Sequence, residues 1–316
     1  MFNLAEPPLF RRLRDARRVL IAGAGGGFDV YAGLPLAIAL DGLGKEVHLA
    51  NHSFSDLTHL VDPSGPNVAR VEPATTGNDA YFPERTLARW LAGTHLAPTV
   101  YAFPRSGVRP LRAAYRWLIA ELDLDAVILV DGGTDILMRG DEAGLGTPEE
   151  DMASLAAVAG IDGINRLVVC LGFGIDAHHG VSHAQVLENL ADLGQNGAYL
   201  GALSIPSDSA EARAYVEAVE HAQRMTPLRP SIVNGQIAAA LRGEFGDAQF
   251  TSRTGGSELF VNPLMSVYFS VDLPGLANRL GYLDRIEETD HPQEISKVIE
   301  AYREQVPIRP GRALPH

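Results

Sequence analysis

The stretch RVLIAGAGGGFD, residues 18–29, decides the fold class. Its short apolar run with β-branched residues predicts a buried strand, and the glycines that follow predict a tight turn. Similar apolar runs return at 125–130 (DAVILV), 166–171 (RLVVCL) and 198–203 (AYLGAL), with amphipathic segments between them. This alternation predicts an α/β, Rossmann-like protein, in which a mostly parallel sheet has helices on both faces.

The chain is expected to form one domain over residues 1–316, because no Pro-, Gly- or Ser-rich linker divides it. Residues 52–96 are polar and irregular apart from a helix expected at 83–92, so we interpret them as an insertion that forms a lid. Residues 247–316 predict a small C-terminal α/β appendage, with a strand near 265–270 and a last helix at 293–304. Capping boxes at 147–150 (TPEE) and 182–185 (SHAQ) predict the starts of two further helices.

The composition narrows the classes of function. There are 26 basic and 39 acidic residues, and the net charge is −13, which argues against a nucleic-acid-binding surface and a basic membrane patch. No apolar stretch is long enough for a signal peptide or a transmembrane helix. The single cysteine, Cys170, excludes an internal disulfide and is expected in the core. We expect a cytoplasmic protein whose partner is a small molecule, and homo-oligomerisation stays open.

Three predicted strands end in glycine turns that each carry an aspartate: AGGGFD (24–29), DGGTD (131–135) and GFGID (172–176). In an open parallel sheet, ligands bind just beyond the carboxyl ends of the strands, and glycine lets the backbone approach a ligand closely. The alternative is that the aspartates only cap helices. The residues expected to bind a ligand or cofactor are Gly25, Gly26, Gly27, Asp29, Gly132, Gly133, Thr134 and Arg139.

The second turn opens an acidic segment, residues 131–151. Asp131 is the candidate metal ligand, because Mg²⁺ prefers one or two carboxylates together with substrate phosphates. Arg139 is a candidate for gripping a carboxylate or phosphate with two nitrogens. Glu149, Glu150 and Asp151 are interpreted differently, as acids that complement the dipole in the first turn of a helix.

The third turn leads into DAHHGVSH, residues 176–183, the richest polar cluster in the chain. Asp135 and Asp176, together with His179 and His183, are the candidate catalytic residues, because carboxylates and imidazoles serve as general acids and bases. The two histidines have the spacing of zinc ligands on one helix, but that helix is expected to start at Ser182, which removes them from a common face.

The first turn resembles a known nucleotide-binding loop. Gly25-Gly26-Gly27, followed after five residues by Gly33-Leu34-Pro35, is similar to the sirtuin-type NAD-binding loop, where a glycine triplet precedes Gly-Ile-Pro at the same spacing. The resemblance covers about 15 residues and implies an NAD-like ligand at this turn. It does not extend to protein deacylation, because sirtuins hold zinc with several cysteines and this chain has one.

A second resemblance covers most of the chain. The motifs GAGGGFD, VDGGTDILMRGDEAGLGTPEEDM, GFGIDAHHGVSHA and SIVNGQIAAAL together resemble a bacterial and archaeal family catalogued as a domain of unknown function. That resemblance implies a bacterial-type protein with the same fold and the same loops, and it implies no activity.

Three hypotheses of function follow from these motifs. The leading one is a small-molecule enzyme that binds a nucleotide, an NAD-like molecule or another phosphorylated ligand at the glycine turns and uses Asp and His for acid–base chemistry. The first alternative is a Mg²⁺-assisted phosphoryl transferase or hydrolase, with the metal at Asp29, Asp131 and Asp135. The second is a ligand-binding module without turnover. The polar turn at 252–258 is a further candidate for phosphate contact, with an ordinary loop as the alternative.

Overall fold

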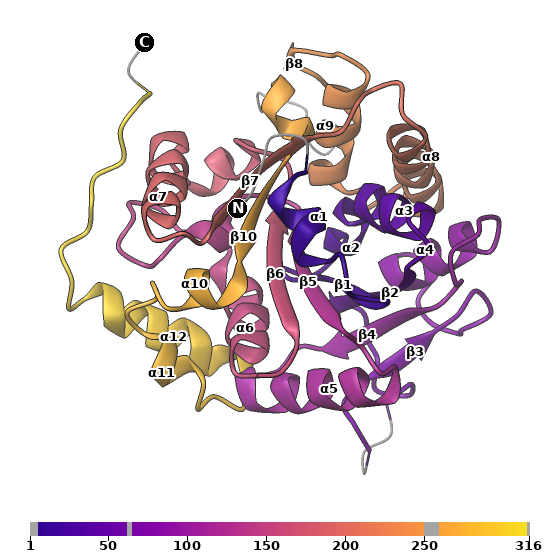
Figure 1. The fold of residues 1–316 in the computed structure, drawn as a ribbon, viewed down its shortest axis with the longest axis horizontal. Coiled ribbons are helices and arrows are strands. Elements are labelled where there is room, and N and C mark those ends of the chain that lie inside the picture. The colour runs from indigo at the N-terminus through magenta and orange to yellow at the C-terminus, as the bar shows by residue number, and fades with distance from the viewer. Residues whose placement is uncertain (1–5, 62–64, 250–258, 315–316) are drawn as a thin grey trace.

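The structure, a computed structural model, describes residues 6–61, 65–249 and 259–314 (Figure 1). An eight-stranded sheet forms its centre, in the order β3-β4-β2-β1-β5-β6-β10-β7. Its strands are β1 Arg18–Gly23, β2 Glu46–Ser53, β3 Ala69–Val71, β4 Val100–Pro104, β5 Ala126–Asp131, β6 Asn165–Cys170, β7 Tyr199–Ser204 and β10 Val267–Asp272. A separate two-stranded ribbon pairs β8, Gly246–Asp247, with β9, Phe260–Val261.

The strand order creates a switch point between β1 and β5. The chain passes from β1 to β2 and β4 on one side, and from β5 to β6 on the other, and all of these neighbours pair in parallel. This is the strand order of a doubly wound Rossmann sheet, whose ligands bind where the order reverses. The α/β, Rossmann-like fold expected from the sequence is therefore confirmed.

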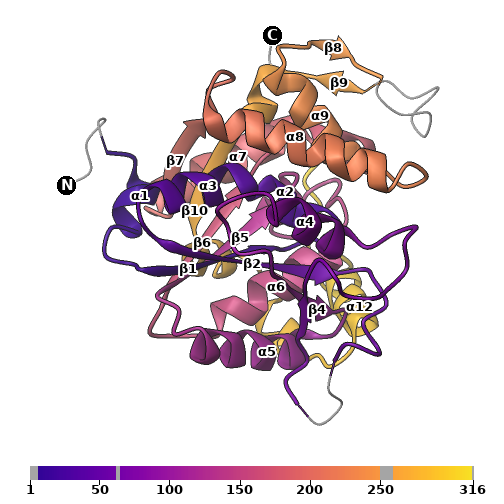
Figure 2. The same ribbon diagram turned by 90° about the vertical axis from the view of Figure 1, so that its right-hand side faces the viewer.

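Helices cover both faces of the sheet and form two hydrophobic cores (Figure 2). Alternate residues of each buried strand face opposite cores, as the pleat requires: Leu20 and Ala22 of β1 pack on one side and Val19 and Ile21 on the other. The first face carries α5 Val108–Glu121, α6 Pro148–Ala159, α7 His183–Gln195, α10 Leu273–Ala277, α11 Leu283–Ile286 and α12 Pro292–Arg303. The second carries α1 Pro8–Arg12, α2 Asp29–Ala32, α3 Leu34–Gly42, α4 Pro83–Leu91, α8 Ala210–Met225 and α9 Ile232–Leu241.

The insertion at 52–96 and the C-terminal segment at 247–316 both contribute a strand to the sheet of the domain. β3, inside the 52–96 insertion, pairs antiparallel with β4 at the sheet edge. β10, inside the 247–316 segment, lies between β6 and β7 and pairs antiparallel with both. Its residues Tyr268, Phe269 and Val271 are buried, so the C-terminal segment supplies part of the cores.

Local details differ from expectation where tertiary contacts compete with local ones. Both helices predicted from capping boxes start as expected, but neither box forms. The Thr147 amide donates to Asp135, and the Ser182 hydroxyl donates to the carbonyl of Arg312. After the first glycine turn the chain forms two short helices, α2 and α3, which meet at Gly33.

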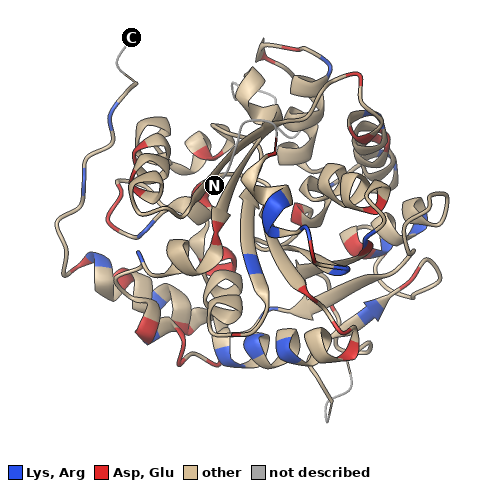
Figure 3. Cartoon of the chain, viewed as in Figure 1, with Lys and Arg blue, Asp and Glu red and all other residues tan. Residues whose placement is uncertain are grey.

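Three remaining features concern one loop, the helices and the surface charge. The turn at 252–258 lies outside the described residues. Across the described ranges, no helix combines the length and the apolar character needed to cross a bilayer. Figure 3 shows acidic and basic residues interspersed along the ribbon, with basic residues spaced along α5.

Candidate functional site

The carboxyl ends of β1, β5 and β6 bring the three glycine turns together at the switch point. In the first turn, Gly26 and Gly27 have φ of +94° and +60°, the left-handed region that favours glycine. This conformation lets the chain reverse so that Asp29, the first residue of α2, turns back on the loop. Its Oδ2 accepts a hydrogen bond of 2.7 Å from the amide of Gly25.

Three aspartates from different elements converge beside this turn. Asp29 comes from α2, Asp131 ends β5, and Asp151 lies in the first turn of α6. One carboxylate oxygen from each lies within 4.8 Å of the others. Asp131 and Asp151 are 3% and 2% exposed, and Asp29 is half-buried. The Oδ1 atom of Asp151 is buried and accepts no hydrogen bond from any described residue.

Two more buried carboxylates lie near these three aspartates. Asp135 begins a short 3₁₀ helix after the second turn, and its Oδ2 accepts a hydrogen bond of 2.8 Å from the Thr147 amide. Asp176 follows the third turn, and its Oδ2 accepts a hydrogen bond of 2.7 Å from the Thr134 amide. Each of these carboxylates is therefore fixed in orientation by the backbone of a neighbouring loop.

Because the aspartates are buried close to one another, their pKa values are raised. Burial raises the pKa of Asp29 to about 8, with further repulsion from Asp135 and opposition from the Gly25 amide. Burial also raises the pKa of Asp131, Asp151 and Asp176 well above the usual range, and repulsion within the group adds to it. A group of ionised carboxylates in such a place needs a cation, or protons, to compensate its charge.

The glycines of the turns make room for these carboxylates. A Cβ atom at Gly25 would lie 2.7 Å from Asp29 Oδ2 and 2.9 Å from both oxygens of Asp151. One at Gly133 would lie 2.7 Å from Asp176 Oδ2, and one at Gly132 would lie 3.0 Å from Asp29 Oδ1. The absence of side chains at these positions is thus tied to the acidic centre itself.

Two buried or half-buried asparagines hold the turns from the outside. The Asn234 side-chain amide donates to the carbonyl of Phe28, and its Oδ1 accepts from the hydroxyl of Tyr215. The Asn262 side-chain amide donates to the carbonyl of Phe173 in the third turn. Both contacts fix loops on which an aspartate follows within three residues.

The two candidate histidines lie on the side of the third turn. His183 packs its ring edge against Phe173 and lines a cavity of about 450 Å³ together with His178, Gln236 and Phe260. His179 is exposed, and burial raises the pKa of Asp135 while the neighbouring His179 opposes that rise. The two histidines follow the third turn, as expected.

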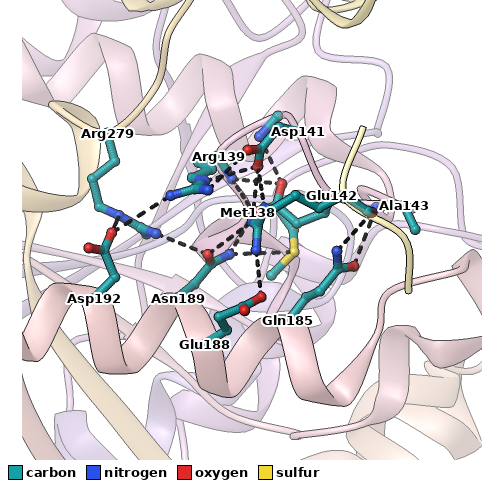
Figure 4. A network of polar contacts seen from close by, with 12 residues as sticks. Met138, Arg139, Asp141, Glu142, Ala143, Gln185, Glu188, Asn189, Asp192 and Arg279 are labelled. Atoms are coloured by element: carbon teal, nitrogen blue, oxygen red, sulfur yellow. Dashed lines mark hydrogen bonds and ion pairs between the residues drawn. The ribbon is translucent and has the colours of Figure 1, made fainter. Parts of the chain in front are cut away.

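Arg139 lies in a separate polar network (Figure 4). Its guanidinium forms two bonds to Asp141, of 2.9 and 3.0 Å, and a weaker ion pair with Asp192. Both nitrogens that would grip a ligand are thereby engaged within the protein. In this structure the Arg139 side chain pairs with Asp141 and Asp192, and so it stabilises the loop between Asp135 and α6.

From the sequence, Asp151 was interpreted as an acid that complements the helix dipole. The structure shows that its side chain also belongs to the acidic centre, beside Asp29 and Asp131. The signal that could have revealed this is the helix itself. After its first turn, α6 reads MASLAAVA and is buried along most of its length, and Glu150 and Asp151 in its first turn are buried too. His52, whose Nδ1 lies 3.4 Å from the hydroxyl of Ser154, was also missed, since β2 gives no sequence sign of it.

The chain belongs to the family described as "Protein of unknown function (DUF1152)", whose model matches residues 20–304. The match includes all three glycine turns and all five aspartates, and it confirms the family resemblance carried by the motifs. A search of curated proteins finds no match.

Proposed function

We propose that the protein is a divalent-cation-dependent enzyme that hydrolyses or transfers a phosphoryl group of a small molecule. The observation that carries this proposal is the convergence of Asp29, Asp131 and Asp151, with donor oxygens within 4.8 Å and one buried oxygen without a partner among the described residues. Ligand oxygens around Mg²⁺ or Ca²⁺ lie roughly 3–5 Å from one another, given metal–oxygen distances of about 2.0–2.6 Å. The donor set, all carboxylate oxygen, is the one these hard cations prefer.

The charge of the site supports a cation over a bare phosphate at the glycine turn. The Gly25 amide, which a pyrophosphate would need as a donor, already donates to Asp29. A phosphate placed on that turn would also face the carboxylates of Asp131 and Asp151. An NAD-like or other nucleotide ligand therefore requires a cation between its phosphates and the aspartates, which joins the leading hypothesis from the sequence to its first alternative.

Each side chain of the site has a proposed role. Asp29, Asp131 and Asp151 would hold the cation, and a bound divalent ion would polarise a phosphoryl oxygen and stabilise developing charge. Asp135 and His179 are proposed as the proton-transferring pair, because the charge of His179 acts on the carboxyl of Asp135 and imidazole is a common general acid or base. Asp176, bonded to the Thr134 amide, holds the second turn against the third.

The test is calorimetric titration of the protein with Mg²⁺, Mn²⁺ and Ca²⁺, repeated on Asp151→Asn. We expect saturable binding that the variant loses. Release of inorganic phosphate from a panel of nucleotides and sugar phosphates then tests turnover with the cation present. If no divalent ion binds the wild type, the proposal fails. Binding of cation and phosphate ester without product would instead identify a ligand-binding module.

A further inference from the structure

A second cavity opens at the carboxyl ends of β2 and β4, beside the acidic centre. It has a volume of about 400 Å³, and Phe54, Asn67 and Arg105 are among its walls. β2 and β4 are parallel neighbours whose last residues, Ser53 and Pro104, pair in register, so the cavity lies on the same edge of the sheet as the glycine turns.

Two residues that line this cavity, Phe54 and Arg105, also contact residues next to the aspartates. The ring of Phe54 packs on the first glycine turn so closely that a Cβ at Gly26 would lie 2.7 Å from its Cε1 atom. On the other side, Arg105 forms an ion pair of 2.5 Å with Glu150, the residue before Asp151. A molecule in the cavity would therefore touch groups that adjoin the acidic centre.

Arg105 is held in a way that leaves it accessible. Its guanidinium lies 5.4 Å from the centre of the Phe54 ring, a contact that orients the planar group. Its side chain is 53% exposed, while that of its partner Glu150 is 9% exposed. Of the described residues that line the cavity, Arg105 is the basic one and Asp56 the acidic one.

The negative charge of the protein explains why an anion would need a basic group at this cavity. The chain has a net charge of −13, and the aspartate centre adjoins the cavity, so an anionic molecule meets a repulsive field. A fixed guanidinium at the entrance offsets that field and binds phosphate or carboxylate oxygens with strong, directional hydrogen bonds. In the structure this guanidinium forms an ion pair with one carboxylate, that of Glu150.

We propose that this cavity is a substrate subsite in which Arg105 binds an anionic group, phosphate or carboxylate, of a molecule whose reacting phosphate lies at the aspartate centre. The substrate is thus a small molecule with two anionic groups. The incoming anion competes with Glu150 for Arg105, and Phe54 positions the guanidinium. The reacting phosphate at the aspartate centre rests on the proposed function. The anion site at Arg105 rests on the cavity alone.

The experiment counts inorganic phosphate bound to the full chain saturated with Mg²⁺, by calorimetry and ³¹P NMR. We expect two phosphates on the wild type, one at the cation and one at Arg105. Arg105→Gln should retain the cation and lose one phosphate, with at least about tenfold weaker binding at that site. Asp151→Asn should lose the cation and keep the phosphate that depends on Arg105. Glu150→Gln should bind that phosphate several-fold more tightly, because the competing carboxylate is gone.

Arg109→Gln is the matched control. Arg109 has a side chain 52% exposed and pairs with Asp290, yet it lies outside the cavity, so its replacement should leave phosphate binding unchanged. If Arg105→Gln binds both phosphates like the wild type, the subsite is overturned while the cation centre stands. If the wild type binds no Mg²⁺ but still binds one phosphate through Arg105, the proposed function fails and the anion site stands. Titration with malonate in place of phosphate separates a carboxylate-selective site from a phosphate-selective one.

Discussion

Two groups of buried carboxylates, one around Glu142 and one around Asp151, are balanced in opposite ways. Glu142 is completely buried, and its oxygens accept hydrogen bonds from two backbone amides, from the side chain of Asn189 and from the guanidinium of Arg309. Asp151, almost equally buried, has an oxygen with no partner among the described residues and repelling acids around it.

This difference indicates that the buried carboxylates have different roles in the two groups. The Glu142 network, which Figure 4 shows, contains the cations and amides that its charge requires, so it fastens the loop and the C-terminal segment. Its member Asp141 is partly buried, which alone would raise its pKa, but hydrogen bonds from Arg139 and Arg309 lower that pKa to about 2. In the aspartate centre, burial and neighbouring acids raise the pKa of Asp131 and Asp151, and we infer that the centre is built for an external cation.

The sharpest way to break this comparison is to remove one charge from each group and measure cation binding. Asp131→Asn should weaken Mg²⁺ or Mn²⁺ binding by at least about a hundredfold, because a direct ligand is lost. Glu142→Gln, assayed well below its unfolding temperature, should bind the cation as the wild type does. Calorimetric titration of both variants decides the matter. Equal loss in the two would show that the groups are not functionally distinct.

Stability should respond with opposite signs. Glu142→Gln removes the charge that Arg309 and two amides are arranged to meet, so the free energy of unfolding should fall by about 3 kcal/mol. Asp151→Asn removes one of several repelling charges and should raise the free energy of unfolding of the cation-free protein, by about 1–3 kcal/mol. Urea unfolding in the presence of a chelator measures both. A destabilised Asp151→Asn protein would contradict our account of the centre.

The pH dependence of stability should carry the same signature. Burial, followed by repulsion from Asp135, raises the pKa of Asp29 from 3.8 to about 8. The folded state therefore keeps a proton that the unfolded chain releases near pH 4, and stability falls as the pH rises from about 4 to about 8. Saturating Mg²⁺ should flatten this decline, because the cation replaces the protons. Thermal unfolding from pH 4 to 9, with and without Mg²⁺, provides the measurement; a decline of equal slope in both series would contradict a cation site at Asp29.

The range of the interactions involved decides which features could be predicted from the sequence. The sheet, the three turns and the location of Asp29, Asp131 and Asp176 come from local patterns, since apolar runs and glycines report strands and turns directly. Cys170 is buried, as expected. The partners of Thr147 and Ser182 are distant in sequence, so the two capping boxes were wrong although the helix starts were right.

The centre itself needed three-dimensional information. Asp151 reaches it because α6 packs under the first turn, where the hydroxyl of Ser154, one helical turn further on, donates to the carbonyl of Ala24. Arg105 follows β4 on a loop with no glycine triplet, and it meets Glu150, which is distant in the sequence. Arg139 was an attractive anion ligand by residue type alone, and only the structure shows its fork closed on Asp141.

The smallest expected effect tests why the turns are rich in glycine. Gly133→Ala would put a methyl group 2.7 Å from Asp176 Oδ2, and the hydrogen bond from the Thr134 amide keeps that carboxylate from moving away. We expect a loss of about 1–3 kcal/mol in the free energy of unfolding. Gly42→Ala is the control: it ends α3, nothing lies within 4 Å of its added Cβ, and it should be neutral or stabilising by about 0.5 kcal/mol.

The pair of glycine variants separates two explanations of the motif. If the glycines serve only backbone flexibility, Asp176→Asn should not change the cost of Gly133→Ala, because the backbone is the same. If they make room for buried carboxylates, a double-mutant cycle should show coupling between the two positions, since the clash and the repulsion share one side chain. Additive free energies of unfolding would therefore argue against the carboxylate explanation, and coupling would tie the glycine motif to the acidic centre.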